Sequence, residues 1–216
     1  CDVGGLRVGE GCFGLLLSRQ GKILSDVSVL AAEDRALMAV APGTAPVLHE
    51  TLDRMLIMED AELRDVSTSH AWICAHGPRA ADRVAATARQ VSGAVSARID
   101  WLGIGGGALV VPPEALPRAL QLLGSGDPGV VVAQGDDFTR LRLERAMPQF
   151  GIDYGPEDTP HQAGLDHRAV CWTKGCYVGQ EVVCMTEQRG KVRRRLALAV
   201  LEGERVPPRG TTVHLA

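Results

Sequence analysis

Residues 172–183, WTKGCYVGQEVV, guide the interpretation of the whole chain. Cys176 lies between a Lys–Gly pair and a tyrosine, and a second glycine, a glutamine and a glutamate follow it. Thiolate is the reactive form of cysteine, and a neighbouring cation such as Lys174 favours it. The glycines allow a tight turn around the thiol. A half-buried structural cysteine beside a glycine turn fits the same residues, because free cysteine is among the most buried residue types.

The overall composition is that of a folded globular protein. The length of 216 residues suits one large or two modest domains. Of these residues 45% are hydrophobic and 23% are charged, the usual mixture for a protein with a hydrophobic core. A formal net charge of −3 provides no general basic field to attract nucleic acid or a membrane surface. No apolar run approaches the ~20 residues that a membrane-spanning helix needs, and no signal peptide is visible. We therefore expect a cytoplasmic protein without membrane contacts.

The six cysteines are irregularly spaced and include no CxxC pair: Cys1, Cys12, Cys74, Cys171, Cys176 and Cys184. This spacing predicts free thiols in a reducing compartment rather than a disulfide framework. The chain begins without methionine and ends in GTTVHLA, which has the pattern of an unfinished strand. We expect further residues at both ends.

Hydrophobic periodicity predicts two units in the first half of the chain. The first is a strand meander followed by a helix, with strands at 13–18, 23–30 and 36–41 and the helix over 44–57. The second alternates strands and helices, with strands at 61–67, 70–77, 94–103 and 106–112 and helices over 77–93 and 112–126. This order favours an antiparallel sheet with helices on one face, a ferredoxin-like α+β arrangement.

The second half begins after a turn-rich boundary at 124–129, GSGDPG. Its predicted elements are strands at 130–135, 182–185 and 193–203, and a helix over 136–147. Asp136 or Asp137 is expected to cap that helix and Pro148 to end it.

The octapeptide KGCYVGQE, residues 174–181, resembles the signature of the YgfZ-type folate-binding proteins, which are relatives of the aminomethyltransferase (T-protein) of the glycine cleavage system. Residues 9–30 are similar to the first-domain meander of that family, and residues 140–166 to its R-x-E-x-G/A-x-P-x-(F/Y)-G segment. Residues 188–200 are similar to the segment that leads into a C-terminal barrel, whereas residues 60–130 fit in pattern only.

The fold that this resemblance implies is α+β, a T-protein-like cloverleaf of domains around a central hole that receives tetrahydrofolate or a one-carbon derivative of it. Two of its domains would be ferredoxin-like. The first would be discontinuous, built from 1–58 and 128–187, and the second, 59–127, would be inserted into it. Residues 188–216 would begin a C-terminal β-barrel.

The resemblance also implies which residues bind folate and which carry chemistry. Glu144 matches the glutamate that holds the pterin ring in T-proteins, and Arg142 would support it or meet the glutamate tail of the cofactor. The residues alone also fit a surface helix with an Arg140–Glu144 pair. T-proteins carry two adjacent aspartates in the second meander strand, one of which serves aminomethyl chemistry. Only Asp26 remains here, after Ser25, and a solvent-facing aspartate fits the position equally well.

The thiol motif distinguishes this chain from T-proteins, which lack it. The resemblance makes Cys176 the working thiol, with Lys174 beside it, and assigns a group of polar neighbours to cofactor binding: Tyr177, Gln180, Glu181 and Arg189. Cys171 and Cys184 flank the thiol, but their spacing matches no common metal-ligand pattern, and His161 and His167 are expected to be loop residues. We therefore predict no metal site.

Two functions follow from the resemblance, beside a third possibility, a protein of this fold that has lost its ligand and acts only as a binding scaffold. One is a tetrahydrofolate-binding accessory protein for the assembly or repair of iron–sulfur enzymes, including tRNA-modifying ones, whose partners are client iron–sulfur proteins. The alternative is a folate-dependent aminomethyltransferase or related one-carbon transfer enzyme, so the residues leave open whether the chain is an enzyme. The basic run at 189–195 fits a solvated face, and contact with the folate polyglutamate tail or with an RNA or protein partner is the alternative. No aromatic side chains accompany the run, which argues against direct nucleic-acid binding.

Overall fold

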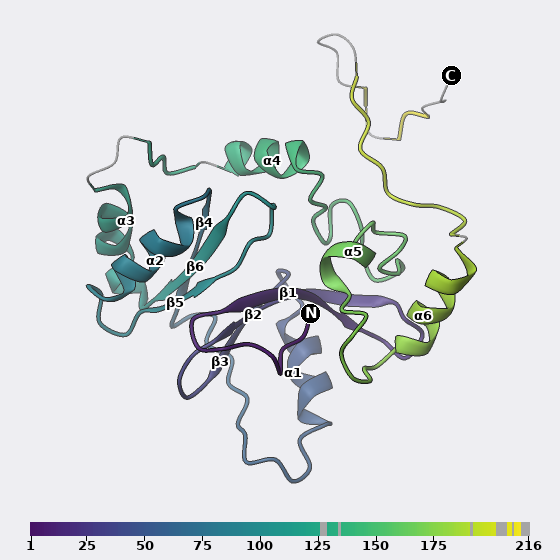
Figure 1. The fold of residues 1–216 in the computed structure, drawn as a ribbon, viewed down its shortest axis with the longest axis horizontal. Coiled ribbons are helices and arrows are strands. Elements are labelled where there is room, and N and C mark those ends of the chain that lie inside the picture. The colour runs from purple at the N-terminus through teal and green to yellow at the C-terminus, as the bar shows by residue number, and fades with distance from the viewer. Residues whose placement is uncertain (126–128, 134, 191, 202–206, 209, 213–216) are drawn as a thin grey trace.

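The computed structural model describes residues 1–125, 129–133, 135–190, 192–201, 207–208 and 210–212. Two three-stranded antiparallel sheets, each with helices against it, give a mixed α/β architecture (Figure 1). No helix in these ranges is long and apolar enough to cross a bilayer.

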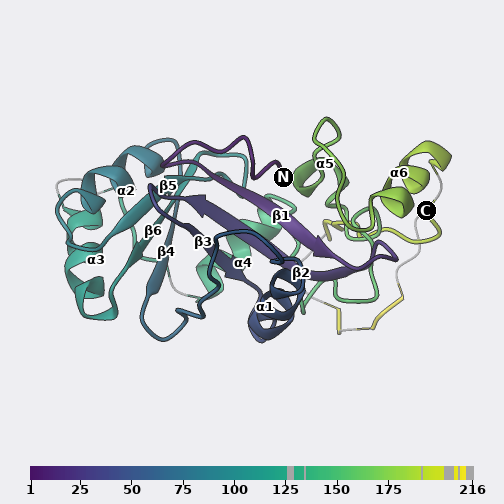
Figure 2. The ribbon, with the colours of Figure 1, turned by 90° about the horizontal axis from the view of Figure 1, so that it is seen from below.

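The first sheet is the predicted meander, with strand order β1–β2–β3: β1 (Gly11–Leu17), β2 (Ile23–Ala31) and β3 (Ala36–Val40). Side chains alternate along β2, so Val27 and Val29 point to one face while Asp26 and Leu30 point to the other. Helix α1 (Ala45–Asp53) covers the valine face, as the view from below shows (Figure 2). The helix predicted over 44–57 is therefore confirmed in a shorter form.

The second sheet has the order β4–β6–β5: β4 (Ala71–His76), β5 (Val95–Arg98) and β6 (Gly106–Val111). Its two helices are α2 (Ala80–Ala88) and α3 (Leu116–Gly124), the latter preceded by a short 3-10 helix, Pro113–Ala115. Leu109 and Val111 pack against these helices, while Ala108 and Val110 point to the opposite face and join Leu30 of β2 in one core. The layers therefore run helix, sheet, sheet, helix.

The strand predicted at 61–67 does not form, which makes that prediction wrong. Asp65 bends the chain there, because its carboxylate accepts hydrogen bonds from the backbone N–H of Ser67 at 2.9 Å and from the Ser67 hydroxyl at 2.5 Å. The second unit consequently has three of the four strands predicted for it, with its helices on one face as expected.

Helix α4 (Gly135–Glu144) confirms the helix predicted over 136–147, but its ends differ from the prediction. Asp136 and Asp137 lie in its first turn rather than at the cap, and residue 134 is outside the described ranges. The helix stops before Pro148, because Ala146 adopts a left-handed φ of 48°. The Met147 N–H then bonds the Arg142 carbonyl at 2.8 Å, as in a Schellman ending.

Ala146→Gly is expected to raise the free energy of unfolding by about 0.5–1 kcal/mol, since glycine adopts this left-handed backbone without steric cost. A urea titration should show a higher midpoint with an unchanged slope. Ala85→Gly, within α2, is the control and should lower stability by about 1 kcal/mol. Equal losses in the two variants would contradict this explanation of the helix end.

The returning segment packs at the far end of the first sheet, where α5 (Asp166–Ala169) and α6 (Gln180–Arg189) lie (Figure 1). Leu17 and Ile23 of the meander share a core there with Tyr154, Leu165 and Val183. The domain boundaries at 58, 127 and 187 stay predictions.

Three strand predictions in this half are wrong. Residues 182–185 lie in α6, where Val183 is buried on the helical face that meets the core. No strand forms at 130–133 or at 193–201. The described ranges leave out position 134 of the strand predicted at 130–135 and positions 202–203 of the strand predicted at 193–203. The 192–201 segment leads away from both sheets beyond α6 (Figure 1).

Candidate functional site

A carboxyl group and a phenol meet on the face of the first sheet that is turned away from α1. The Tyr154 hydroxyl donates a hydrogen bond to Asp26 Oδ2 at 3.2 Å. Burial raises the pKa of Asp26 above its ordinary value, and burial together with the Asp26 charge raises the pKa of Tyr154. The phenol therefore stays protonated as a donor, while the carboxyl group is suited to exchange a proton in a partly desolvated position.

Tyr154 was not predicted from the sequence to belong to the site. The only feature of the sequence that could have drawn attention to Tyr154 is that tyrosine is rare here: the chain has only two tyrosines and few other aromatic residues. Its position relative to Asp26 depends on how residues 150–154 fold back onto β2, and no local pattern encodes that contact.

Ser25 lies on the opposite side of the strand from Asp26, as alternation along β2 requires. Its buried Oγ contacts Thr44 Oγ1 at 2.6 Å and accepts the Ala41 N–H at 3.3 Å. Ser25 therefore fixes the start of α1, and its hydroxyl also donates to the Asp26 backbone carbonyl at 2.7 Å, while its side chain stays on the other face from the Asp26 carboxyl group.

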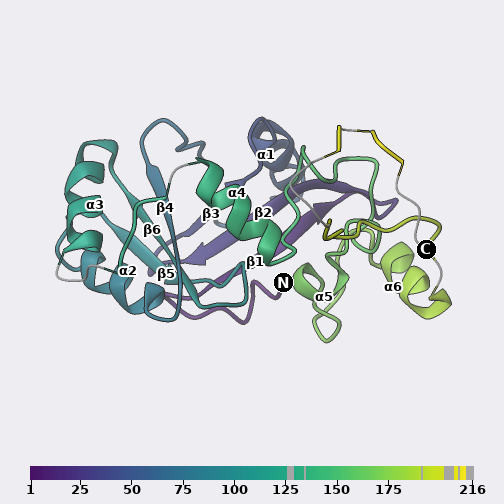
Figure 3. The same ribbon diagram turned by 90° about the horizontal axis from the view of Figure 1, so that it is seen from above.

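Aromatic side chains continue the Asp26 face towards the second sheet. The Trp101 Nε1–H donates to Ser28 Oγ at 2.8 Å, two residues along the strand from Asp26. The His76 ring lies edge-on to Trp101 and stacks on Phe138 of α4, with centroid distances of 5.7 Å in both pairs. Helix α4 is seen from above in Figure 3. These rings form one aromatic cluster that reaches the Asp26 strand through Ser28.

His76 has unused hydrogen-bonding capacity in this cluster. Both of its ring nitrogens are buried, and neither has a hydrogen-bond partner in the described part of the chain. Burial lowers the pKa of His76, which favours the neutral ring with one donor and one acceptor.

The two residues predicted to hold folate through α4 occupy different environments. Glu144 is exposed and pairs with Arg140 at 3.0 Å, which is the surface pair considered as the alternative. Arg142 is buried, donating to Asp153 Oδ2 at 2.6 Å and to the Met147 carbonyl at 3.3 Å. Arg142 thus holds the segment after α4 in place. The folate-binding roles of Glu144 and Arg142 stay predictions.

The thiol motif forms a loop and the start of α6. Cys176 is exposed. Lys174 Nζ donates to the Cys1 carbonyl at 2.8 Å and lies 4.9 Å from the centroid of the Tyr177 ring. The Tyr177 N–H donates to Gln180 Oε1 at 3.2 Å, which helps to close the first turn of the helix.

The remaining polar residues of the motif lie on the surface of α6. Glu181 is exposed in the first turn, where its charge suits the helix dipole, and Arg189 is exposed in the last turn. All six cysteines are free, as predicted. In the same loop, hydrogen bonds from Thr173 lower the pKa of the Cys171 thiol. The cofactor-binding roles of the motif residues stay predictions.

A histidine–carboxylate group lies where only loop residues were expected. One ligand atom from each of His161, Asp166 and Glu187 falls within 4.8 Å of the others, and His161 Nε2 is 3.0 Å from Glu187 Oε2. Asp166 also pairs with Arg195 at 2.8 Å, so its charge is already balanced. His167 lies in α5, not in a loop, 3.2 Å from Asp166. The group reads as an ion-pair network that joins α6 to α5.

Comparisons with known proteins agree with this architecture. No protein-family model matches the chain. An aminomethyltransferase of Streptomyces coelicolor is 28% identical over 98% of the chain and 63% of its own length, and one of Synechocystis is 26% identical over 93% and 59%. The chain thus spans about three fifths of these curated relatives.

A solved structure shares the fold. The glycine cleavage system aminomethyltransferase T from Bartonella henselae superposes with a TM-score of 0.66 at 21% identity, covering 88% of this chain and 56% of its own. Similarity along nearly the whole chain and the shared fold together support placing this protein in the superfamily of the aminomethyltransferases, the T-proteins of the glycine cleavage system.

Proposed function

We propose that this protein binds tetrahydrofolate, or a one-carbon derivative of it, and takes part in aminomethyl or related one-carbon transfer. The observation that carries the proposal is the half-buried Asp26 carboxyl group, which accepts the Tyr154 hydroxyl. The name that the curated relatives share, aminomethyltransferase, supports the same reaction class.

In this proposal Asp26 is the general acid–base group. A carboxyl group with a raised pKa holds and releases a proton more readily near neutral pH than an exposed aspartate does. Tyr154 fixes the orientation of the carboxylate through its hydrogen bond. Because Ser25 replaces the second aspartate and faces away, one carboxyl group would do this work alone.

The aromatic cluster at the Asp26 strand fits a reduced folate. A planar heterocycle could stack on the half-buried ring of Trp101 in this cluster. Tetrahydrofolate, when bound, accepts the one-carbon unit. Glu144 is proposed to hold its pterin ring and Arg142 to support Glu144, inside a cloverleaf whose barrel would begin near residue 188.

A second candidate function rests on a different observation, the exposure of Cys176 in its loop. An exposed thiol could exchange disulfides or persulfides with client iron–sulfur proteins, including enzymes that modify tRNA. The names of the curated relatives give this role no support, so the transferase is the first proposal. For either function we propose a cytoplasmic protein.

Calorimetric titration of tetrahydrofolate tests the cofactor. Wild-type protein should bind, and Glu144→Ala should bind about tenfold more weakly or worse, because it loses a charge-assisted hydrogen bond to the pterin. Glu50→Ala is the matched control, since Glu50 also forms an exposed i,i+4 pair, with Arg54, on another helix. Equal affinity of Glu144→Ala and wild type would reject the role of Glu144. Absence of binding to wild-type protein would reject the proposed function.

Cys176→Ser separates the two functions. It should leave aminomethyl transfer unchanged if the first proposal holds, and it should abolish support of iron–sulfur enzymes if the second does.

A further inference from the structure

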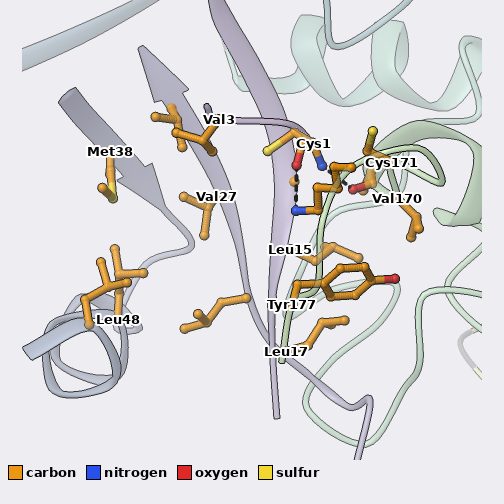
Figure 4. Close-up of a pocket in the computed structure, with 16 residues that line it drawn as sticks. Cys1, Val3, Leu15, Leu17, Val27, Met38, Leu48, Val170, Cys171 and Tyr177 are labelled. Carbon is orange, nitrogen blue, oxygen red and sulfur yellow. Dashed lines mark hydrogen bonds between the residues drawn. The ribbon is translucent and has the colours of Figure 1, made fainter. Parts of the chain in front are cut away.

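A cavity of about 290 Å³ lies over the valine face of the first sheet and reaches the edge strand β1, where Leu15 and Leu17 also line it. Val27 and Val29 form its floor, and Met38 and Leu48 line it on the side of β3 and α1. Figure 4 shows Val27, Met38 and Leu48 together with Tyr177, which comes from the thiol-motif loop. The walls are therefore almost wholly apolar, and none of them contributes a carboxylate.

Two ammonium groups border this apolar cavity, that of Cys1, which donates to the Ala169 carbonyl at 2.8 Å, and that of Lys174. Lys174 lines it, partly buried, and its ammonium group donates one hydrogen bond, to the Cys1 carbonyl (Figure 4). The ring of Tyr177 packs 4.9 Å from the same nitrogen. Within the described ranges, no carboxylate lies within 4.0 Å of the Lys174 ammonium group. Two N–H donors and a positive charge thus remain available at the edge of an apolar space.

We propose that this cavity binds a small aliphatic carboxylate. The alkyl chain would lie over Val27 and Val29, and the carboxylate would accept hydrogen bonds from Lys174 Nζ. The Lys174 ammonium group with two available donors matches a monoanion better than a phosphate, which needs more donors. At roughly 30 Å³ per water-sized group, the cavity holds about ten non-hydrogen atoms, the size of octanoate.

The valine floor of the cavity faces away from the proposed folate surface. Val27 and Asp26 are neighbours in sequence and therefore point to opposite faces of β2. Octanoate and tetrahydrofolate should bind at the same time. The carboxylate site is thus a second site, and it assigns Lys174 of the thiol motif to ligand binding rather than to the activation of Cys176.

Calorimetry on the full chain with octanoate as the probe tests the proposal. Octanoate should bind to wild type, and Lys174→Met should weaken its binding about tenfold, while octan-1-ol should bind equally to both proteins. Hexanoate should bind about tenfold more weakly than octanoate, because it buries two fewer methylene groups. Lys22→Met is the control, since Lys22 lies outside the cavity lining and bonds the Glu157 carbonyl instead.

Methyl NMR on wild-type protein gives a test that needs no variant. Octanoate should shift the methyl resonances of Val27, Val29 and Leu48, and it should leave those of Val84 and Val111, in the other core, in place. The proposal is overturned if octanoate does not bind saturably, if Lys174→Met binds it as wild type does, or if the shifts lie elsewhere. Competition by tetrahydrofolate would also overturn it, whereas octanoate binding without folate binding would reject only the proposed function.

Discussion

Asp26→Asn is expected to slow one-carbon transfer about 10²- to 10⁴-fold, the usual loss when a positioned acid–base group is removed. The amide keeps the shape of the carboxylate and can still accept the Tyr154 hydroxyl, so packing around β2 should persist. The assay is turnover with an aminomethylated carrier protein and tetrahydrofolate. Binding of tetrahydrofolate alone should change little, because the loss concerns proton transfer.

The pH dependence gives this prediction a second readout. Burial raises the folded-state pKa of Asp26, so a rate that needs its carboxylate should rise with pH through that raised pKa. The asparagine variant should lack this rising limb of the pH–rate profile. Tyr154→Phe removes a hydrogen bond to the charged form, so it should move the limb to higher pH while the ring still packs in the core.

Stability should change in the opposite direction to activity. The folded protein binds the Asp26 proton more tightly than the unfolded chain does, so ionisation of Asp26 opposes folding above the unfolded pKa. Asp26→Asn should therefore be at least as stable as wild type at neutral pH, and any advantage should disappear in acid. Asp34→Asn, at an exposed site, is the control for activity. Undiminished turnover in Asp26→Asn would remove Asp26 from the mechanism.

Local patterns predicted the parts of the fold whose partners are close in sequence. The meander β1–β3 has tight turns between alternating strands, and the amphipathic α3 follows its strand directly. The errors came where another contact outweighed the pattern. The run VVCM has strand propensity, yet residues 182–185 are helical because Val183 joins the core formed by Leu17 and Tyr154.

The candidate site was predictable only in part. A family resemblance directed attention to Asp26, and period-two alternation was enough to place Ser25 on the other face. The Tyr154 contact is separated from Asp26 by 128 positions, and the pairing of His76 with Phe138 joins different elements. Such contacts depend on how the layers pack. The motif residues were predicted as one polar site, but Lys174 lines an apolar cavity while Glu181 faces solvent.

Gly179→Ala is expected to lower the free energy of unfolding by about 3 kcal/mol. Gly179 caps α6 with a left-handed φ of 80°, which costs an alanine about 1 kcal/mol. A Cβ at this position would also lie 2.5 Å from the Ser18 carbonyl oxygen and 3.1 Å from the Gly21 Cα. Both are backbone atoms of the β1–β2 turn, so no side-chain rotation can relieve the overlap.

The measurement is chemical or thermal unfolding beside two matched variants. Gly190→Ala changes the residue at the other end of α6, which also has positive φ, but a Cβ there would meet no described atom within 4 Å, so it should cost only about 1 kcal/mol. Gly175→Ala, where the space is open and no left-handed φ occurs, should be nearly neutral. The thermal midpoint of Gly179→Ala should fall by roughly 6–12 °C.

The difference in stability between these three variants separates two roles of the motif KGCYVGQE. One is to pack α6 against the β1–β2 turn, and the other is to present the Cys176 thiol. Gly179 brings the first turn of α6 against the β1–β2 turn, and the loop that carries Cys176 is anchored by that contact. A thiol motif selected only for reactivity would not require a glycine at this position. If Gly179→Ala lowered the free energy of unfolding no more than Gly190→Ala does, the β1–β2 turn would have to move aside at little energetic cost. The exposure of Cys176 would then be a property of a loosely held loop rather than of a fixed one.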